Sequence, residues 1–232
     1  MRFTLAIGLA FVLVTADLAA PLADARAELA LSQLVVELTP GDHSRTDLEV
    51  LNTGSDQAFV SVDPREIIAP GTLKQSRQDE PDPEKLGLLV SPARIILDPG
   101  QRRLIRIAAI APPSDSERVY RVTVKPVAGQ LEGQGSGLKI LLGYDVLVLV
   151  RPRDLRPHIS GTRSGNEMTL QNDGNVSLEL VDGQRCEQRS NACKPLPGTR
   201  LYAGASTRIP ASPNESVVYK AKIGSKVLPV EF

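Results

Sequence analysis

The sequence is dominated by short aliphatic segments in which apolar and polar residues alternate, and most of them end at a proline or a glycine. Residues 47–52, 58–63 and 119–125 are the clearest examples. After residue 27, no segment keeps apolar residues three and four positions apart over three helical turns. Alternation with a period of two, broken by turn residues about every 8 to 12 positions, is typical of antiparallel β-sandwiches. We therefore predict an all-β fold.

Composition narrows the class further. Hydrophobic residues make up 41% of the chain but aromatic residues only 3%, so the core must be aliphatic. This content is too high for a disordered chain, and neither a collagen period nor a persistent heptad is present. The 27 basic and 27 acidic side chains give a formal net charge of zero. Since bulk nucleic-acid binding depends on clustered positive charge, we expect no nucleic acid among the partners.

The first 27 residues have the layout of a secretory signal peptide. Arg2 supplies the positive start, residues 5–14 form an apolar run, and residues 25–27 read Ala-Arg-Ala, a cleavage pattern. The alternative is a membrane anchor, but the run is short for a span, and Asp17 and Asp24 lie in the stretch after it. We expect residues 1–27 to be removed and the mature chain to be exported without membrane insertion.

Residues 138–151 form an unusually long apolar segment, which ends at Arg151-Pro152. In one extended strand, Leu138, Ile140, Leu142 and Tyr144 would share a face, because side chains alternate. This stripe needs a cover, either the domain's own core or another chain. We predict a first domain at residues 28–152 and a second, smaller β-sandwich domain at residues 153–232.

Two cysteines, Cys186 and Cys193, are the only ones in the chain. An exported protein can form disulfides, and the spacing suits a bridge across a short hairpin or loop. A metal site would need more ligands, and His43 and His158 are far away in the sequence. We predict a structural disulfide and no metal site.

Enzyme signatures are missing. The chain has no G-x-S-x-G elbow, and its two histidines leave little freedom for a catalytic triad. The glycine-rich residues 133–137 lack the Lys-Ser/Thr of a phosphate-binding loop and precede a strand. The polar residues 74–85 are typical of a mobile surface loop. We predict that the protein is not an enzyme and needs no cofactor, although a hydrolase built on a β-sandwich stays a minor alternative.

Three segments, in order, resemble motifs of the periplasmic pilus-assembly chaperones. Residues 90–107 contain Ser-Pro-Ala-Arg-Ile-Ile-Leu-Asp-Pro-Gly, residues 117–126 begin Glu-Arg-Val-Tyr-Arg-Val, and the long apolar segment ends at Val150-Arg151-Pro152. The resemblance covers most of the chain after residue 27, weakly beyond Pro152.

This resemblance implies two immunoglobulin-like domains in an L, and a seventh strand that completes the fold of pilus (fimbrial) subunits by donor-strand complementation. It also implies that the protein acts in the periplasm and delivers those subunits to an outer-membrane usher. Aligned on Arg151-Pro152, the donor positions of the family fall on Leu138, Ile140 and Leu142, and Tyr144 continues the same face.

The chain departs from the family at the anchor for the subunit's terminal carboxylate. The family uses an arginine on the first strand and a lysine on the seventh, where this chain has Val35 and Leu147. The sequence offers four other basic candidates, of which Arg121 and Lys125 could simply line a solvated strand face: Lys139, Arg151, Arg121 and Lys125.

Two questions about the whole protein stay open at this stage. The chain could instead be an exported immunoglobulin-like structural or adhesive module that covers the 138–144 stripe with its own core. The free protein could also self-associate to hide that stripe.

Overall fold

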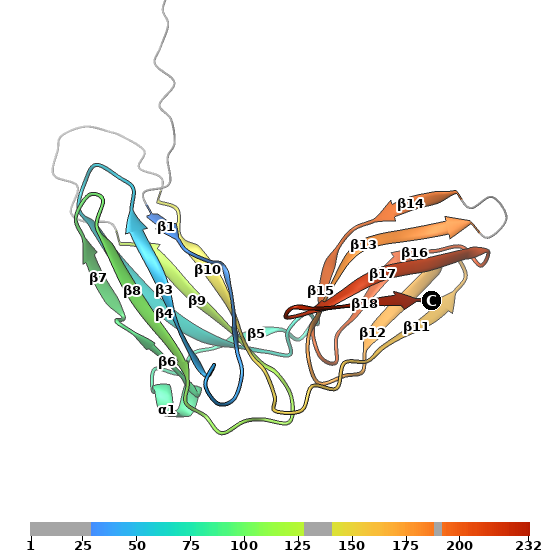
Figure 1. The fold of residues 1–232 in the computed structure, drawn as a ribbon, viewed down its shortest axis with the longest axis horizontal. Coiled ribbons are helices and arrows are strands. Elements are labelled where there is room, and N and C mark those ends of the chain that lie inside the picture. Colours follow the sequence, from blue (N-terminus) through green and yellow to red (C-terminus); the bar gives the residue numbers. More distant parts are fainter. Residues whose placement is uncertain (1–28, 128–140, 188–191) are drawn as a thin grey trace, which may run out of the picture.

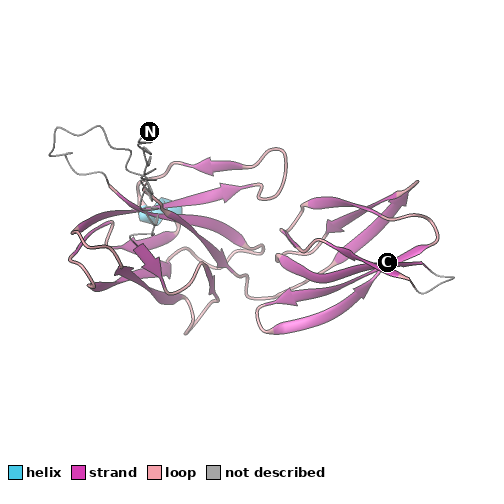
Figure 2. Ribbon diagram, turned by 90° about the horizontal axis from the view of Figure 1, so that it is seen from above, coloured by secondary structure: helices cyan, strands magenta, loops and turns pink. Residues whose placement is uncertain are grey.

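A computed structural model of the chain describes residues 29–127, 141–187 and 192–232. Its strands form two β-sandwiches, one from residues 29–150 and one from residues 159–231, set at an angle to each other (Figure 1). The view from above shows the same two bodies joined by a single passage of chain (Figure 2). The prediction of an all-β chain with two immunoglobulin-like sandwiches in an L is confirmed.

The first sandwich packs two sheets face to face. One sheet has the order β1 (Leu29–Leu31), β3 (Arg45–Asn52), β8 (Arg102–Ala109) and β6 (Leu88–Ser91). The other has the order β2 (Val35–Leu38), β10 (Tyr144–Val150), β9 (Arg118–Pro126), β4 (Ala58–Ile68) and β5 (Ser76–Gln78), with β7 (Arg94–Leu97) also paired to β4. A short helix, α1 (Pro83–Leu86), precedes β6.

The second sandwich also packs two sheets around an aliphatic core of its own, and each of its sheets has fewer strands than its counterpart in the first sandwich. One sheet has the order β11 (Ile159–Ser164), β12 (Glu167–Asn172) and β16 (Ser206–Pro210). The other has the order β14 (Cys193–Leu196), β13 (Leu178–Glu187), β17 (Glu215–Ile223) and β18 (Lys226–Glu231), with β15 (Thr199–Leu201) paired to β13. Separate cores mean that each sandwich buries its own apolar face.

The period-two pattern determines which side chains reach the core. In β9, Val122 and Val124 are fully buried, whereas Arg121 and Thr123, which alternate with them, lie on the outer face of the sheet. In β3, Leu48 and Val50 are buried in the same way. Burial of one such side chain contributes about 1.5–3 kcal/mol, so the alternation fixes the register of each strand.

One pair of strands runs parallel, which the sequence pattern did not predict. The chain leaves β1 in one sheet, crosses at residues 32–34, and joins the other sheet as β2 beside β10. The parallel ladder joins Leu147 to Val35 and ends with Val150 opposite Leu38. The start of the domain is therefore held against its last strand.

The long segment 138–151 is not one strand in its described part. β10 begins only at Tyr144, and residues 141–143 are not in a strand, while residues 138–140 lie outside the described residues. Tyr144 pairs with Val124, so continued pairing would set Leu142 opposite Pro126. Proline has no N–H to donate, and this ends the ladder. The second half of the segment is buried on both faces, as we expected: residues 146–149.

The polar residues 74–85 are more ordered than the loop that we predicted. β5 pairs with the end of β4, and Asp82 caps α1 by accepting a hydrogen bond from the Glu84 amide at 3.0 Å. Pro83 occupies the first turn, and Gly87 ends the helix with a φ of 79°. Asp-Pro before a helix and glycine after it are known cap signals, so this element was readable from the sequence.

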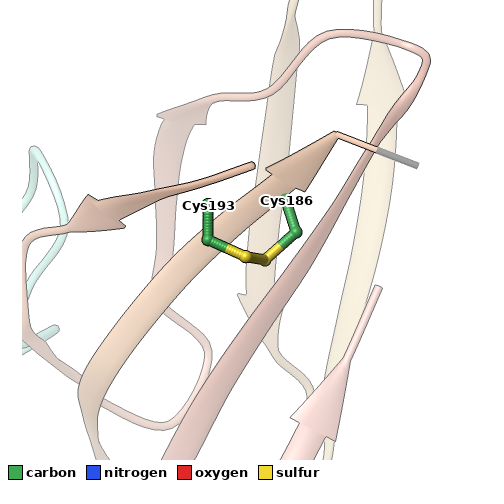
Figure 3. Close-up of a disulfide and its surroundings, with 2 residues drawn as sticks. All are labelled: Cys186 and Cys193. Carbon is green, nitrogen blue, oxygen red and sulfur yellow. A yellow bond between two sulfur atoms is a disulfide. The ribbon is translucent and has the colours of Figure 1, made fainter. Parts of the chain in front are cut away.

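The predicted disulfide between Cys186 and Cys193 is confirmed, with an S–S distance of 2.02 Å. The two residues lie directly opposite each other on β13 and β14 (Figure 3). The bridge thus joins the two strands at the end of their hairpin.

Residues of both sandwiches meet at the junction. Arg151 is buried and forms an ion pair with Glu37 at 2.9 Å and another with Glu117, and it also contacts Ser177 of the second sandwich. Asn175 donates to the carbonyl oxygens of Asp115 and Asp154, at 2.8 Å each. These contacts tie the second sandwich to the end of the first.

Candidate functional site

The predicted donor residues flank the start of β10. Leu138 and Ile140 lie outside the described residues, whereas Leu142 is 53% exposed just before the strand. Tyr144 is half-buried, packs against the first core, and donates its hydroxyl to the Leu29 carbonyl at 2.7 Å. Tyr144 therefore closes its own domain's core, and Leu142 is the described member of the stripe that faces solvent.

The beginning of β10 has an open edge. β9 pairs with β10 from Tyr144 to Val150, but the ladder with β2 starts only at Leu147. On that side, residues 144–146 have no strand partner among the described residues. Unpaired N–H and C=O groups on a strand edge can pair with a strand from another chain.

Arg121 lies next to the two positions where the resemblance led us to expect basic anchors. Leu147 is paired with Val35 on β2 and with Arg121 on β9, so the three residues form one row across the sheet. Paired residues in a sheet share a face with their Cβ atoms about 5 Å apart. Arg121 thus places a guanidinium beside the position of the missing lysine, one strand further into the sheet.

The same outer face carries a group of charged and polar side chains, which we call the polar belt: Asp63, Arg65, Arg77, Arg121, Thr123, Lys125 and Asp145. Arg65 forms ion pairs with Asp63 at 3.0 Å and with Asp79, and Arg77 pairs with Asp145 at 2.6 Å. The Arg121 guanidinium donates to the Asp145 main-chain oxygen at 3.1 Å and has no carboxylate partner within the described ranges.

A cavity of about 200 Å³ opens between this belt and the second sandwich. Arg77, Arg121 and Asp145 line one side, and Tyr202 of the second sandwich lines the other. Val119, Leu147 and Leu149 form a small buried cluster beside it, against which Tyr202 packs. The cavity is lined mainly by polar atoms and is large enough for a carboxylate group.

The other anchor candidates lie in different places. Lys139 is outside the described residues, and Lys125 is exposed near the end of β9. Arg151 has a side chain that is only 2% exposed and is already paired with Glu37 and Glu117, so it offers no open face to a carboxylate. We therefore do not count Arg151 among the anchors proposed below.

Sequence reasoning missed Arg77, because it lies in the polar run that we expected to be a loop. The pairing of β5 with β4 brings Arg77 opposite Ile67, and its guanidinium then reaches Asp145 on β10. These two residues are 68 positions apart in the chain. No local signal in the sequence indicates this contact.

In the part of the chain that the structure describes, no group of three or more histidine, cysteine or acidic side chains is arranged to hold a metal ion. Nor does any helix there have the length and apolar character needed to cross a membrane. The site offers a strand edge, an exposed leucine and guanidinium groups.

The sequence pattern of the family described as "Pili and flagellar-assembly chaperone, PapD N-terminal domain" matches residues 29–156, more than half of the chain. The chain belongs to this family. Among curated proteins, one named for the CS1 fimbriae of Escherichia coli is 26% identical over 171 residues, which cover 68% of this chain and 71% of that protein.

Solved structures of such chaperones share the fold. The class 5 fimbriae chaperone CfaA is 21% identical and superimposes with a TM-score of 0.68, covering 88% of this chain and 98% of that one. A chain from the structure of a chaperone–tip adhesin complex of CFA/I fimbriae biogenesis is 20% identical, with a TM-score of 0.67 and the same coverage. Both sandwiches and their connection therefore have counterparts in these structures.

Proposed function

We propose that the protein is a periplasmic chaperone that binds pilus subunits by donor-strand complementation and delivers them to an outer-membrane usher. The observation that carries this proposal is the open edge of β10 at residues 144–146, directly after the alternating apolar residues 138–142. Such an edge supplies main-chain hydrogen bonds, and alternating apolar side chains fill a partner's open core. Membership of the chaperone family supports the proposal.

Leu138, Ile140 and Leu142 are the proposed donor side chains. Leu142 is already 53% exposed, so its burial in a subunit would remove apolar surface from water. Each such burial contributes about 1.5–3 kcal/mol to the complex. Tyr144 ends the donor row, because its hydroxyl bond to Leu29 ties it to the chaperone's own core.

Arg121 is the proposed anchor for the subunit's terminal carboxylate, with Lys125 nearby on the same strand face. Arg121 lines the cavity and lies opposite Leu147 in the sheet. A guanidinium binds a carboxylate through two parallel hydrogen bonds, which fixes the register of the chain that carries it. The anchor would thus set which subunit residues meet Leu142.

Delivery to the usher requires a second surface that the subunit leaves free. On the β4 and β7 side of the same sheet, Phe59, Ile96 and Val127 are each about half exposed and line a groove of about 540 Å³. Exposed apolar surface of this kind is typical of protein–protein contacts. The signal peptide proposed at residues 1–27 would place the chain in the compartment where usher and subunits meet.

A pull-down from the periplasm of a fimbriated source strain tests the function. Tagged wild-type protein, Ile140→Asp and Arg121→Gln are compared with Leu104→Asp, which puts the same charge on an exposed leucine of the opposite sheet. We expect wild type and Leu104→Asp to recover subunits, Ile140→Asp to lose at least nine tenths of them, and Arg121→Gln to recover fewer.

Unchanged recovery with Ile140→Asp would rule out the donor-strand mechanism. If even the wild type recovered no subunit, the protein would instead be an exported structural or adhesive module. Circular dichroism of each variant confirms that a loss of binding is not a loss of folding.

A further inference from the structure

Asp145 is the meeting point of two arginine side chains in the polar belt. Its carboxylate accepts a hydrogen bond from Arg77 Nη2 at 2.6 Å and one from Thr123 Oγ1 at 3.0 Å. Its main-chain oxygen accepts from Arg121 Nη1 at 3.1 Å. Guanidinium groups from β5 and β9 therefore converge on one residue of β10, and these three residues line a cavity together with Tyr202.

The arrangement has the composition of a carboxylate-binding site that already holds a carboxylate. The Arg77 guanidinium and the Thr123 hydroxyl hold the Asp145 carboxylate, while the Arg121 guanidinium bonds to the main-chain oxygen of the same residue. An ionised acceptor shortens and strengthens each hydrogen bond that it accepts. Asp145 supplies that acceptor from within the chain. A second carboxylate entering the cavity would compete with Asp145 for Arg77.

Asp145 is held weakly enough to be displaced. The Arg77 side chain is 51% exposed and that of Asp145 is 38% exposed. Ion pairs with such exposure contribute little, because solvent screens the charges and ordering two side chains costs entropy. The pair can thus orient the arginines without blocking a ligand that brings its own binding energy.

The position of Asp145 also fits the course of a bound subunit. Asp145 follows Leu142 by three residues, and its side chain points to the outer face, opposite to the buried Val146 and Val148. A strand that pairs with the open edge at residues 144–146 would run alongside Asp145, while Arg121 lies on β9, on the other side of β10.

We propose that Asp145 is an internal stand-in for the subunit's terminal carboxylate, and that Arg77 is a second anchoring residue which Asp145 releases on binding. This inference rests on the proposed function. In the free protein, the Asp145 carboxylate binds the Arg77 guanidinium, and the Asp145 main-chain oxygen binds that of Arg121. In the complex, the subunit's carboxylate takes the Arg77 hydrogen bonds, and Asp145 turns to solvent.

Asp63 provides a matched control for the loss of negative charge. Thr123 on β9 is paired with Asp145 on one side and with Asp63 on the other, so the two carboxylates flank the same residue. Asp63 pairs with Arg65, which also has Asp79 as a partner, and neither contacts Arg77. Asp63→Asn therefore removes the same charge without freeing Arg77.

The test measures the affinity of the full-length mature protein for a short peptide of alternating valine and threonine. One form carries a free C-terminal carboxylate and the other a C-terminal amide, and titration is followed by the NMR signals of the arginine Nε–H groups. We expect Asp145→Asn to bind the free-acid peptide about two- to fivefold more tightly than wild type, as loss of a surface ion pair predicts. Binding of the amide form should not change.

Arg77→Gln should bind the free-acid peptide more weakly than wild type does, with no change in its affinity for the amide. Asp63→Asn and the conservative Asp145→Glu should bind like wild type. The stand-in role is overturned if Asp145→Asn binds the free acid no better than wild type does, or if Asp63→Asn produces the same gain. If wild type prefers the free acid and Arg121→Gln abolishes that preference, Arg121 is an anchor even if the stand-in role of Asp145 is wrong. If wild type shows no preference for the acid, both the anchor and the stand-in are wrong.

Discussion

Glu117 and Arg151 form an ion pair in which both side chains are almost completely shielded from solvent. One carboxylate oxygen of Glu117 accepts from Arg151 and from the Ser177 amide, while the other, Oε1, has no hydrogen-bond partner in the described structure. Burial therefore raises the pKa of Glu117 above its ordinary value of 4.5, and the charge of Arg151 offsets only part of this effect. A buried pair of this kind contributes more to the geometry of the junction than to stability.

The raised pKa of Glu117 predicts a pH dependence of stability. The folded protein binds the Glu117 proton more tightly than the unfolded chain does, so the contribution of this group is fully present below about pH 4.5 and is lost as the pH rises through the folded-state pKa. We expect the free energy of unfolding of wild type, relative to Glu117→Gln, to fall as the pH rises over this window. Urea unfolding between about pH 4 and 8 measures the difference.

Asp47→Asn provides a control of opposite sign. The hydrogen bond from Arg106 holds the pKa of the Asp47 carboxyl below its usual value, so its contribution is present at higher pH and is lost as the pH falls. A difference between wild type and Glu117→Gln that rose with pH would contradict the assigned direction.

At the level of elements, each sandwich has a turn that is closed by a buried asparagine side chain. Asn52 at the end of β3 and Asn172 at the end of β12 are fully buried. Each donates to the carbonyl four residues later and to one distant carbonyl, that of Leu97 or Leu201, at 2.7–3.0 Å. Each also accepts from the amide of a glycine two residues later, at 2.9 Å. One side chain thus pins a turn and a neighbouring strand in each domain.

Replacing either asparagine should destabilise its own sandwich. Asn52→Ala and Asn172→Ala each remove two hydrogen bonds to carbonyl groups, at least one of them buried, and we expect a loss of about 2–4 kcal/mol in the free energy of unfolding. Asn214→Ala, in an exposed turn, should change it by less than about 0.5 kcal/mol. Chemical denaturation measures all three, and equal effects of Asn172→Ala and Asn214→Ala would refute the structural role.

For the whole molecule, Tyr202 connects the two sandwiches. Its ring packs against the second core and against the cluster on the outer face of the first sandwich, which includes Leu147 and Leu149. Gly71 of the loop between β4 and β5 fits under the ring, where an added Cβ would lie 3.0 Å from Tyr202 Cδ2. Because the proposed anchor cavity lies between the same surfaces, the angle between the sandwiches also sets the shape of that cavity.

Removing the Tyr202 ring should loosen the angle between the sandwiches. We expect Tyr202→Ser to broaden the distribution of interdomain distances in small-angle X-ray scattering, whereas Tyr202→Phe keeps the packing and stays like wild type. Tyr202 is only partly buried and lies at the edge of the second core, so each sandwich should still fold. Identical scattering from wild type and Tyr202→Ser would show that the buried contacts of Arg151 and Asn175 suffice to fix the angle.

Local patterns in the sequence were sufficient for the class of fold and for the disulfide. Alternation in residues such as 119–125 identifies strands because side chains on a strand point to opposite faces, and this rule needs no partner. The same alternation identified the stripe at residues 138–144 as a candidate for binding, and the motifs before Pro152 identified the family that the comparisons confirm.

Only the tertiary structure decided how that stripe is used and what surrounds it. In the structure, Leu142 is exposed and Tyr144 is held by Leu29, and β10 begins at Tyr144, two residues before the ladder would reach Pro126. Arg151 is buried at the junction of the two sandwiches, and Arg121 lies opposite Leu147 on the neighbouring strand. Sheet register and packing bring together residues far apart in the chain, as with Arg77 and Asp145, so no local pattern records them.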